Sequence, residues 1–234
     1  MSYTSRMPPV KSRREQYSQA TKAALLEAAT RRFAEHGFAG TALEDVAADI
    51  QASRGAVYHH FASKTALFEA VVEALETEMI REVVEAVATT PDTWQAAMTA
   101  MEMFLDHCCD PDYGRVVWQE APIALGWKRW KECEEKFAYG LIEQLIKALV
   151  DSGEVPPLPL EPMARITFHI LGSAGMALAE APRTGQAQGQ GRVLRGDQAP
   201  AERSAQAGGQ PFLTRCAGGA APCGGGVGRH PRMS

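Results

Sequence analysis

Hydrophobic residues recur at helical spacing near the start of the chain. Between residues 18 and 36 the apolar positions fall three or four residues apart, at Leu25, Leu26, Ala29, Phe33 and Ala34. This spacing predicts an amphipathic helix, because one side of an α-helix repeats every 3.6 residues. Gly37 follows directly and is a typical residue for the C-terminal end of a helix.

Two short helices are predicted next. The segment from Thr41 to Glu44 has the form of a capping box, which predicts a helix from Ala42 to about Asp49. Its buried positions are expected at Leu43, Val46, Ala47 and Ile50. Ser53 is a favourable N-cap, so a third helix should run from Arg54 to about Phe61. The short connection between these two helices, over residues 42–61, indicates a helix-turn-helix.

Helical patterning continues to residue 180. Ser63 is expected to cap a fourth helix with its apolar face at Leu67, Phe68, Val71, Val72 and Leu75, and with Glu69, Glu73, Glu76 and Glu78 on its other faces. Four further segments are predicted at 94–109, 113–120, 127–150 and 161–180, separated by proline and glycine. Since no alternating strand pattern competes, the first 180 residues are predicted to be all-α.

Charge is distributed unevenly over the 234 residues, although the net charge is only −4. Residues 1–64 hold nine Lys/Arg against six Asp/Glu, whereas residues 65–180 hold eight against twenty. A basic arm over residues 1–18, with Lys11, Arg13 and Arg14, begins the chain. We therefore expect the N-terminal end to bind a polyanion. With no secretion signal and no apolar run of about 18 residues, a cytoplasmic protein without membrane contact is expected.

The sequence shows few signs of metal or catalytic chemistry. Adjacent helical residues project about 100° apart, so neither His59 and His60 nor the His107-Cys108-Cys109 run is suited to sharing one ion. The five cysteines form no CxxC pair, and no nucleophile elbow, HExxH or glycine-rich phosphate loop occurs. We predict no catalytic residues, no metal and no cofactor.

The predicted helix-turn-helix carries residues suited to DNA. In such motifs the second helix enters the major groove while helix ends hold phosphates. Donors, small residues and helix N-termini suggest contacts by Thr41, Ser53, Arg54, Gly55, Ala56, Tyr58, His59 and Lys64. For His60, packing or helix-end hydrogen bonding and DNA contact both remain open.

Residues 19–79 resemble the DNA-binding domain of the tetracycline-repressor (TetR/AcrR) family, most specifically in GAVYHHFASKTALF from Gly55. The resemblance implies a homodimer that binds a palindromic double-stranded operator, with residues 80–181 forming a helical effector-binding and dimerisation domain. It implies a repressor released by an unknown small molecule. It also implies phosphate contacts for Thr41, Tyr58 and Lys64. The groove-facing residues would be Arg54, Gly55, Ala56 and His59.

Two positions differ from the pattern of that family, where the turn of the motif commonly carries glycine. Here Gln51 occupies it, followed by Ala52 in place of a larger apolar residue. If the turn requires a positive φ, Gln51 costs about 1 kcal/mol relative to glycine.

Aromatic and methionine side chains in the acidic segment, residues 65–180, suit either an apolar pocket or a helical core. The candidate ligand-binding residues are Met101, Phe104, Trp118, Trp127, Trp130 and Tyr139. The charged run from Lys128 to Lys136 predicts a solvated face. The competing hypothesis is a helical ligand-binding or redox-sensing protein that keeps the head fold without binding DNA.

The composition changes after Ala181, where 12 of the last 54 residues are Gly and five are Pro. Such a segment has too few apolar residues for a packed core, so residues 182–234 are predicted to be a disordered tail. Arginine without lysine amid Gly, Ala and Pro is typical of a GC-rich gene read out of frame. We hypothesise that a frameshift near Pro182 replaced a final helix of the dimer interface and weakened the dimer.

Overall fold

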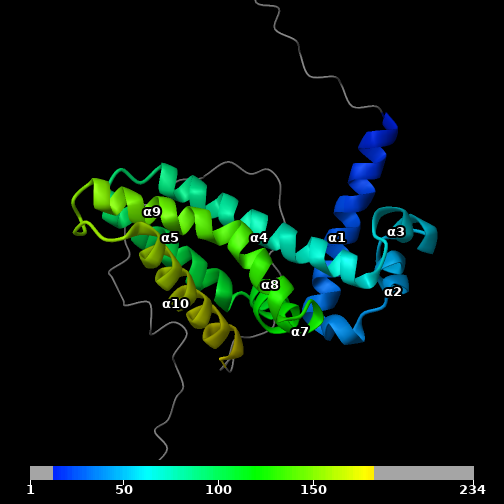
Figure 1. Ribbon diagram of the computed structural model, residues 1–234. Coiled ribbons are helices and arrows are strands. Elements are labelled where there is room, and N and C mark those ends of the chain that lie inside the picture. The colour runs from blue at the N-terminus through cyan, green and yellow to red at the C-terminus, as the bar shows by residue number, and fades with distance from the viewer. Residues whose placement is uncertain (1–12, 182–234) are drawn as a thin grey trace, which may run out of the picture. The chain divides into compact units, whose positions relative to one another are not determined.

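The computed structural model describes residues 13–181, and all regular structure in that range is helical, as predicted (Figure 1). The helices are α1 (Arg13–Gly40), α2 (Leu43–Asp49), α3 (Arg54–His60), α4 (Lys64–Ala88), α5 (Thr93–Cys109), α6 (Pro111–Tyr113), α7 (Ala121–Ala124), α8 (Trp127–Glu134), α9 (Gly140–Asp151) and α10 (Leu160–Glu180). Two π-helical segments lie among them, η1 (Gly114–Glu120) and η2 (Glu135–Tyr139).

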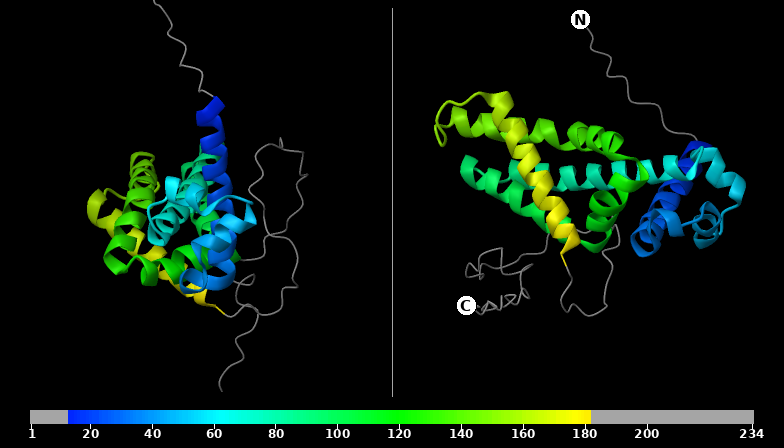
Figure 2. Two further views of the ribbon diagram at one scale, coloured as in Figure 1. Left: turned by 90° about the vertical axis from the view of Figure 1, so that its right-hand side faces the viewer. Right: turned by 60° about the horizontal axis from the view of Figure 1, so that its bottom comes forward.

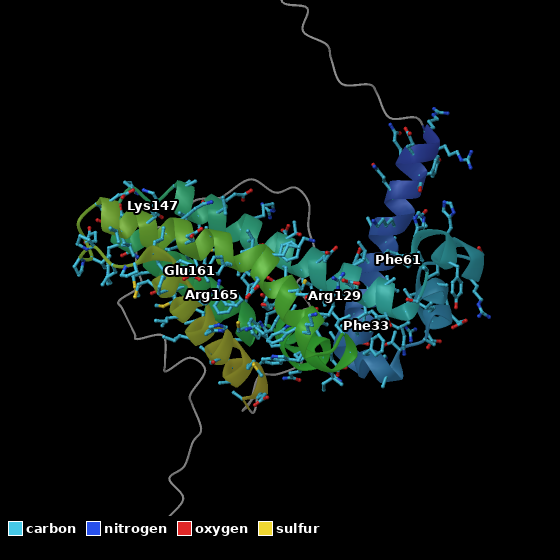
Figure 3. All side chains as sticks on the ribbon, viewed as in Figure 1. Phe33, Phe61, Arg129, Lys147, Glu161 and Arg165 are labelled. Atoms are coloured by element: carbon cyan, nitrogen blue, oxygen red, sulfur yellow. The ribbon has the colours of Figure 1, made fainter. Side chains whose placement is uncertain are left out.

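Helices α1 to α3 and the start of α4 form an N-terminal head around aromatic side chains. The rings of Phe33 and Phe68 meet edge to face with centroids 4.8 Å apart, and Phe38 stacks on the same cluster. Figure 3 labels Phe33 and Phe61 within this head. The predicted caps are confirmed: Ser53 Oγ accepts from the Ala56 amide (3.2 Å) and Ser63 Oγ from the Ala66 amide (3.1 Å).

The first helix begins earlier than predicted. Arg13 and Arg14, expected in the basic arm, lie in the first turn of α1, while Lys11 is outside the described residues. Gly37 has φ 71° and ψ 174°, so it interrupts the helix where the sequence predicted its end. A single turn continues to Gly40, and the chain then enters α2.

The capping-box prediction for α2 was wrong. Its N-cap is Ala42, and Thr41 precedes it with only 2% of its surface exposed. The Thr41 hydroxyl donates instead toward the carbonyl oxygens of Gly37 (2.9 Å) and Arg32 (3.1 Å). The last carbonyls of a helix have no intrahelical donor, and Thr41 supplies one to the end of α1.

The turn of the helix-turn-helix holds one residue at a positive φ, which is why glycine is common there. Gln51, between α2 and α3, adopts φ 54°, so its side chain is held in the left-handed region at a cost of about 1 kcal/mol. The Ala52 amide donates to the Ala47 carbonyl (2.9 Å), which closes the turn.

The second part of the chain is a helical body that shares α4 with the head. The boundary expected between residues 79 and 80 falls inside this helix (Figure 1). Helix α10 packs across α5, α9 and η1, as the second view of Figure 2 shows for its yellow ribbon beside green α9. A Cβ on Gly175 would lie 2.9 Å from the Trp118 ring, so glycine allows α10 this close approach to η1.

Two acids expected on solvated faces are buried in the body. Glu76 has none of its surface exposed and Glu134 only 4%, which corrects the predicted acidic face of α4 and the predicted solvated run 128–136. Glu76 falls four residues after Val72 and seven before Val83, on the stripe that α5 and its neighbours cover. Within the described range no helix has both the length and the apolar character needed to cross a membrane. Residues 182–234, with the proposed frameshift, lie outside that range.

Candidate nucleic-acid interface and internal cavity

Helix α3 presents polar side chains on the outside of the head. Arg54, Gly55, Tyr58 and His59 are exposed, and Ala56 is half-buried. Arg54 Nε lies 3.1 Å from a carboxylate oxygen of Glu44, and its guanidinium lies 5.4 Å from the Tyr58 ring centroid. The buried residue of this helix, Val57, fixes the opposite face in the core. The arrangement leaves one face of α3 available to a partner.

The two histidines differ in their surroundings. Their rings meet edge to face with centroids 5.1 Å apart, and His59 is exposed whereas His60 is half-buried beside Phe61. Burial, and then the neighbouring His59, lower the pKa of His60. His59 is therefore the better placed of the two to reach outward.

Lys64 joins the start of α4 to the end of α1. Its ammonium donates to the carbonyl oxygens of Phe38 (2.8 Å) and Thr41 (3.0 Å) and lies 4.5 Å from the Phe38 ring centroid. The polar groups of Lys64 and of the Thr41 side chain hold the head together. Their roles at phosphates stay predictions.

A cavity of about 450 Å³ lies in the body, in the size range of small-molecule sites. Its walls come from α4, α5, η1, α8, α9 and α10 and are mostly apolar. Of the six candidate ligand-binding residues, five line it: Met101, Phe104, Trp118, Trp127 and Trp130.

Tyr139 does not line the cavity. Its ring packs edge to face on Phe168 with centroids 6.1 Å apart, and its hydroxyl donates to the Glu161 carbonyl (3.5 Å). The guanidinium of Arg165 covers the same ring at 5.3 Å. Figure 3 labels Glu161 and Arg165 on α10, the helix that holds Tyr139 away from the cavity.

The cavity also has a polar end that periodicity alone did not reveal. Glu134 lines it, and Glu76 lies behind, where Glu76 Oε1 accepts from the Tyr113 hydroxyl (2.6 Å). Burial raises the pKa of Glu76 to about 7, although the Tyr113 hydrogen bond opposes this. Burial, and then the charge of Glu76, raise the pKa of Glu134 well above its usual range. The only available signal was position, since Glu76 shares a helical stripe with Val72, Met79 and Val83.

A third residue that the sequence did not reveal connects the body to the head. Glu120, at the end of η1, accepts through Oε2 from the Phe38 amide (2.8 Å), just after the interruption at Gly37. Arg115 of the same segment donates to the Glu35 carbonyl (3.2 Å). On α8, Arg129 donates through Nε to Glu69 of α4 (2.7 Å), where Figure 3 labels it. The segment that carries Trp118 in the cavity is thus attached to the end of α1.

Both parts of the chain match one family. Residues 25–71 match the description "Bacterial regulatory proteins, tetR family", and residues 94–194 match "Tetracyclin repressor-like, C-terminal domain". An HTH-type transcriptional repressor of Mycobacterium tuberculosis is 44% identical over 59 residues, which are 25% of this chain and 31% of that protein.

Solved structures agree. A TetR-family transcriptional regulator from Pectobacterium atrosepticum is 29% identical to this chain and superposes with a TM-score of 0.64. The match covers 73% of this chain and 86% of the chain of that regulator. RolR, solved in complex with resorcinol, shares the fold with a TM-score of 0.56 and 16% identity. The match covers 71% of this chain and 82% of the RolR chain. With its helix-turn-helix head and helical body, the chain belongs to the TetR family of DNA-binding transcriptional regulators, which are not enzymes.

Proposed function

We propose that this protein is a repressor that binds a palindromic operator as a homodimer and releases it when a small organic molecule occupies the body cavity. The observation that carries this proposal is the exposed polar face of α3. It lies on a head that α4 and η1 connect to the body, and the body contains the cavity. The exposed helix supplies the contacts to DNA, and the cavity supplies a place for an effector.

Binding to DNA is supported by the chemistry of the α3 face. A helix entering the major groove reads base edges with residues near its N-terminus, which here are Arg54 and Gly55. Tyr58 and His59 follow one turn later and remain exposed. Genomic fragments captured by the purified protein should supply the operator, and its affinity should fall steeply as salt rises, because phosphate contacts release counterions. The absence of any salt-dependent binding would favour the alternative of a ligand-binding protein that does not contact DNA.

Replacing Arg54 by alanine should weaken operator binding by about 1–3 kcal/mol and affect random DNA much less, since a base-edge contact is lost. Fluorescence anisotropy with both duplexes at fixed salt measures the difference. The Glu44 ion pair adds little, because exposed pairs contribute about 0–1 kcal/mol. Arg81→Ala is the matched control, as this exposed arginine of α4 pairs with Glu78 in the body. An equal loss on both duplexes would assign Arg54 to a phosphate instead.

Release by an effector is supported by the connection between the cavity and α1. Trp118 lines the cavity, and Glu120 lies two residues further along η1, where it holds the Phe38 amide. A molecule that displaces Trp118 moves η1 and strains this hydrogen bond. Because α3 packs against α1 through α2, the two α3 helices of a dimer would then leave the spacing of their half-sites. RolR with resorcinol shows that this fold accommodates a small organic ligand.

Dimerisation is supported by apolar side chains left exposed on the body. Ile166 and Ile170 of α10 are 52% and 62% exposed, four residues apart on one face. A second copy packed against this face of α10 would bury both side chains.

Ile170→Glu should weaken the dimer about tenfold or more, because it places an unpaired charge in an apolar interface. Multi-angle light scattering over a series of concentrations measures the shift. Ile123→Glu is the control, since Ile123 is 84% exposed on α7 and outside the proposed face. If the frameshift hypothesis holds, the wild-type dimer is itself weak and depends on concentration. A tight dimer with a protease-resistant segment 191–234 would contradict that hypothesis.

A further inference from the structure

The polar end of the cavity contains buried groups that the rest of the chain leaves without partners. Among the described residues, no hydrogen-bond partner meets Glu134 Oε1, Glu76 Oε2, Trp118 Nε1 or Trp130 Nε1. Each of these atoms is sequestered from solvent, and an unpaired buried polar atom destabilises the folded state. Three of the four belong to residues that line the cavity. Of these three, Glu134 Oε1 lacks a donor, whereas the two indole N–H groups lack an acceptor.

Aromatic rings surround the same end. Trp118 and Trp130 meet edge to face with centroids 5.5 Å apart, Trp127 lies 4.9 Å from Trp130, and Phe104 lies 5.9 Å from Trp118. These four rings come from α5, η1 and α8 and form one continuous cluster. Indole faces attract cations through the ring quadrupole, and aromatic cages are a common site for ammonium groups.

The two π-helical segments place these groups together. Trp118 is part of η1, and Glu134 is the residue directly before η2. Single turns of π-helix inside α-helices occur frequently at functional sites, because they turn side chains that a regular helix would place elsewhere. In this body they bring a carboxyl group and indole rings to one wall of an otherwise apolar cavity.

Basic groups do not satisfy the carboxyls in the described part of the chain. Lys131 also lines the cavity on α8, yet it forms no ion pair with Glu134, whose Oε1 is unpartnered. His169, on α10, also lines the cavity, and it is exposed. The buried carboxyls Glu76 and Glu134 thus lie next to each other in an apolar body without a cation.

We propose that the cavity binds an apolar organic cation, a protonated or quaternary amine on an aromatic or alkyl body, with its nitrogen against Glu134 and among the rings of Trp118, Trp127 and Trp130. This inference rests on the proposed function, since it names the effector class of the same cavity. The apolar body of the ligand lies along the walls from α5, α9 and α10. The charged nitrogen supplies the donor that Glu134 Oε1 lacks and favours the ionised carboxylate, which burial and Glu76 disfavour in the free protein.

Three probes with the same phenyl-alkyl body and different polar ends test the ligand class: phenylbutylamine, phenylbutanol and phenylbutyrate. Isothermal titration calorimetry at neutral pH on the full-length protein should show the amine binding about tenfold or more tightly than the alcohol and the carboxylate, the effect of one desolvated charge pair. Equal or tighter binding of the alcohol overturns the proposal. Tighter binding of phenylbutyrate also overturns it and would assign Lys131 or His169 as the polar contact.

Glu134→Gln tests the residue. It should remove the preference for the amine and leave the affinity for phenylbutanol within about twofold, because glutamine keeps the shape of the side chain and cannot ionise to pair with the ammonium. Glu132→Gln, on the exposed side of α8, should keep the preference. An unchanged amine preference in Glu134→Gln contradicts the assignment. Should that variant fail to fold, the ranking of the three probes on the wild-type protein still decides the ligand class.

The same amine added to the protein on its operator separates this inference from the proposed function. Release of DNA supports both. Preferential binding of the amine without release supports the cationic ligand class and contradicts the proposed release mechanism. Failure of the protein to bind any DNA contradicts the repressor function and leaves the amine preference measurable by calorimetry.

Discussion

Glu76→Gln should raise the free energy of unfolding by about 3 kcal/mol at pH 8, because the wild-type protein must bury a charge that glutamine does not carry. The pKa of Glu76 is raised by burial from an ordinary value of 4.5 to about 7. Between these two pH values the unfolded chain loses this proton while the folded chain keeps it. The contribution of Glu76 to stability therefore decreases from pH 4.5 to pH 7 and is level above that range. Glutamine keeps an oxygen that can accept from the Tyr113 hydroxyl.

Urea denaturation followed by tryptophan fluorescence at pH 5 and pH 8 measures this effect. The difference between Glu76→Gln and wild type should be small at pH 5 and large at pH 8. Glu73→Gln is the matched control on the same helix, since Glu73 is partly exposed and paired with Lys136 (2.7 Å), and it should shift stability by under about 1 kcal/mol. Equal stability of Glu76→Gln and wild type at pH 8 would mean that the Glu76 carboxyl is not confined in the body.

Gly37→Ala should destabilise the protein by about 3 kcal/mol and loosen the attachment of the head to the body. Gly37 has φ 71° and ψ 174°, a region that is essentially restricted to glycine. A Cβ there would also lie 2.7 Å from Glu120 Oε1. Glu120 would have to move, and its hydrogen bond to the Phe38 amide would be lost.

The two parts of this effect can be separated. Thermal and urea unfolding of Gly37→Ala, Glu120→Ala and the double variant form a cycle in which the clash with Glu120 disappears from the double variant while the backbone strain remains. Gly40→Ala is the control, because its φ is not positive and a Cβ there would approach only the His36 Cβ, at 3.4 Å. Additive losses in the cycle would show that Gly37 and Glu120 do not interact.

Local sequence determined where α3 and α4 of this protein begin. Ser53 and Ser63 each supply a hydroxyl that accepts from the amide three residues on, and this depends on neighbours in the chain alone. Gly37 was recognisable for a similar reason, since glycine is favoured where the backbone must leave the helical region. The motif around Gly55 identified the head through its resemblance to the DNA-binding domain of the TetR family.

Tertiary structure decided which polar residues are buried and what they contact. Thr41 has the sequence of a cap, yet it donates to the end of α1 because that helix end packs against it. Glu76 and Glu134 read as surface acids, since a sequence shows one apolar stripe per helix and does not show how many neighbours cover it. Glu120 holds the Phe38 amide from 82 residues away, and no local pattern records such a distance. Periodicity determined the helices, whereas the packing of α4, α5, α8 and η1 around the carboxyl groups determined the cavity and its polar end.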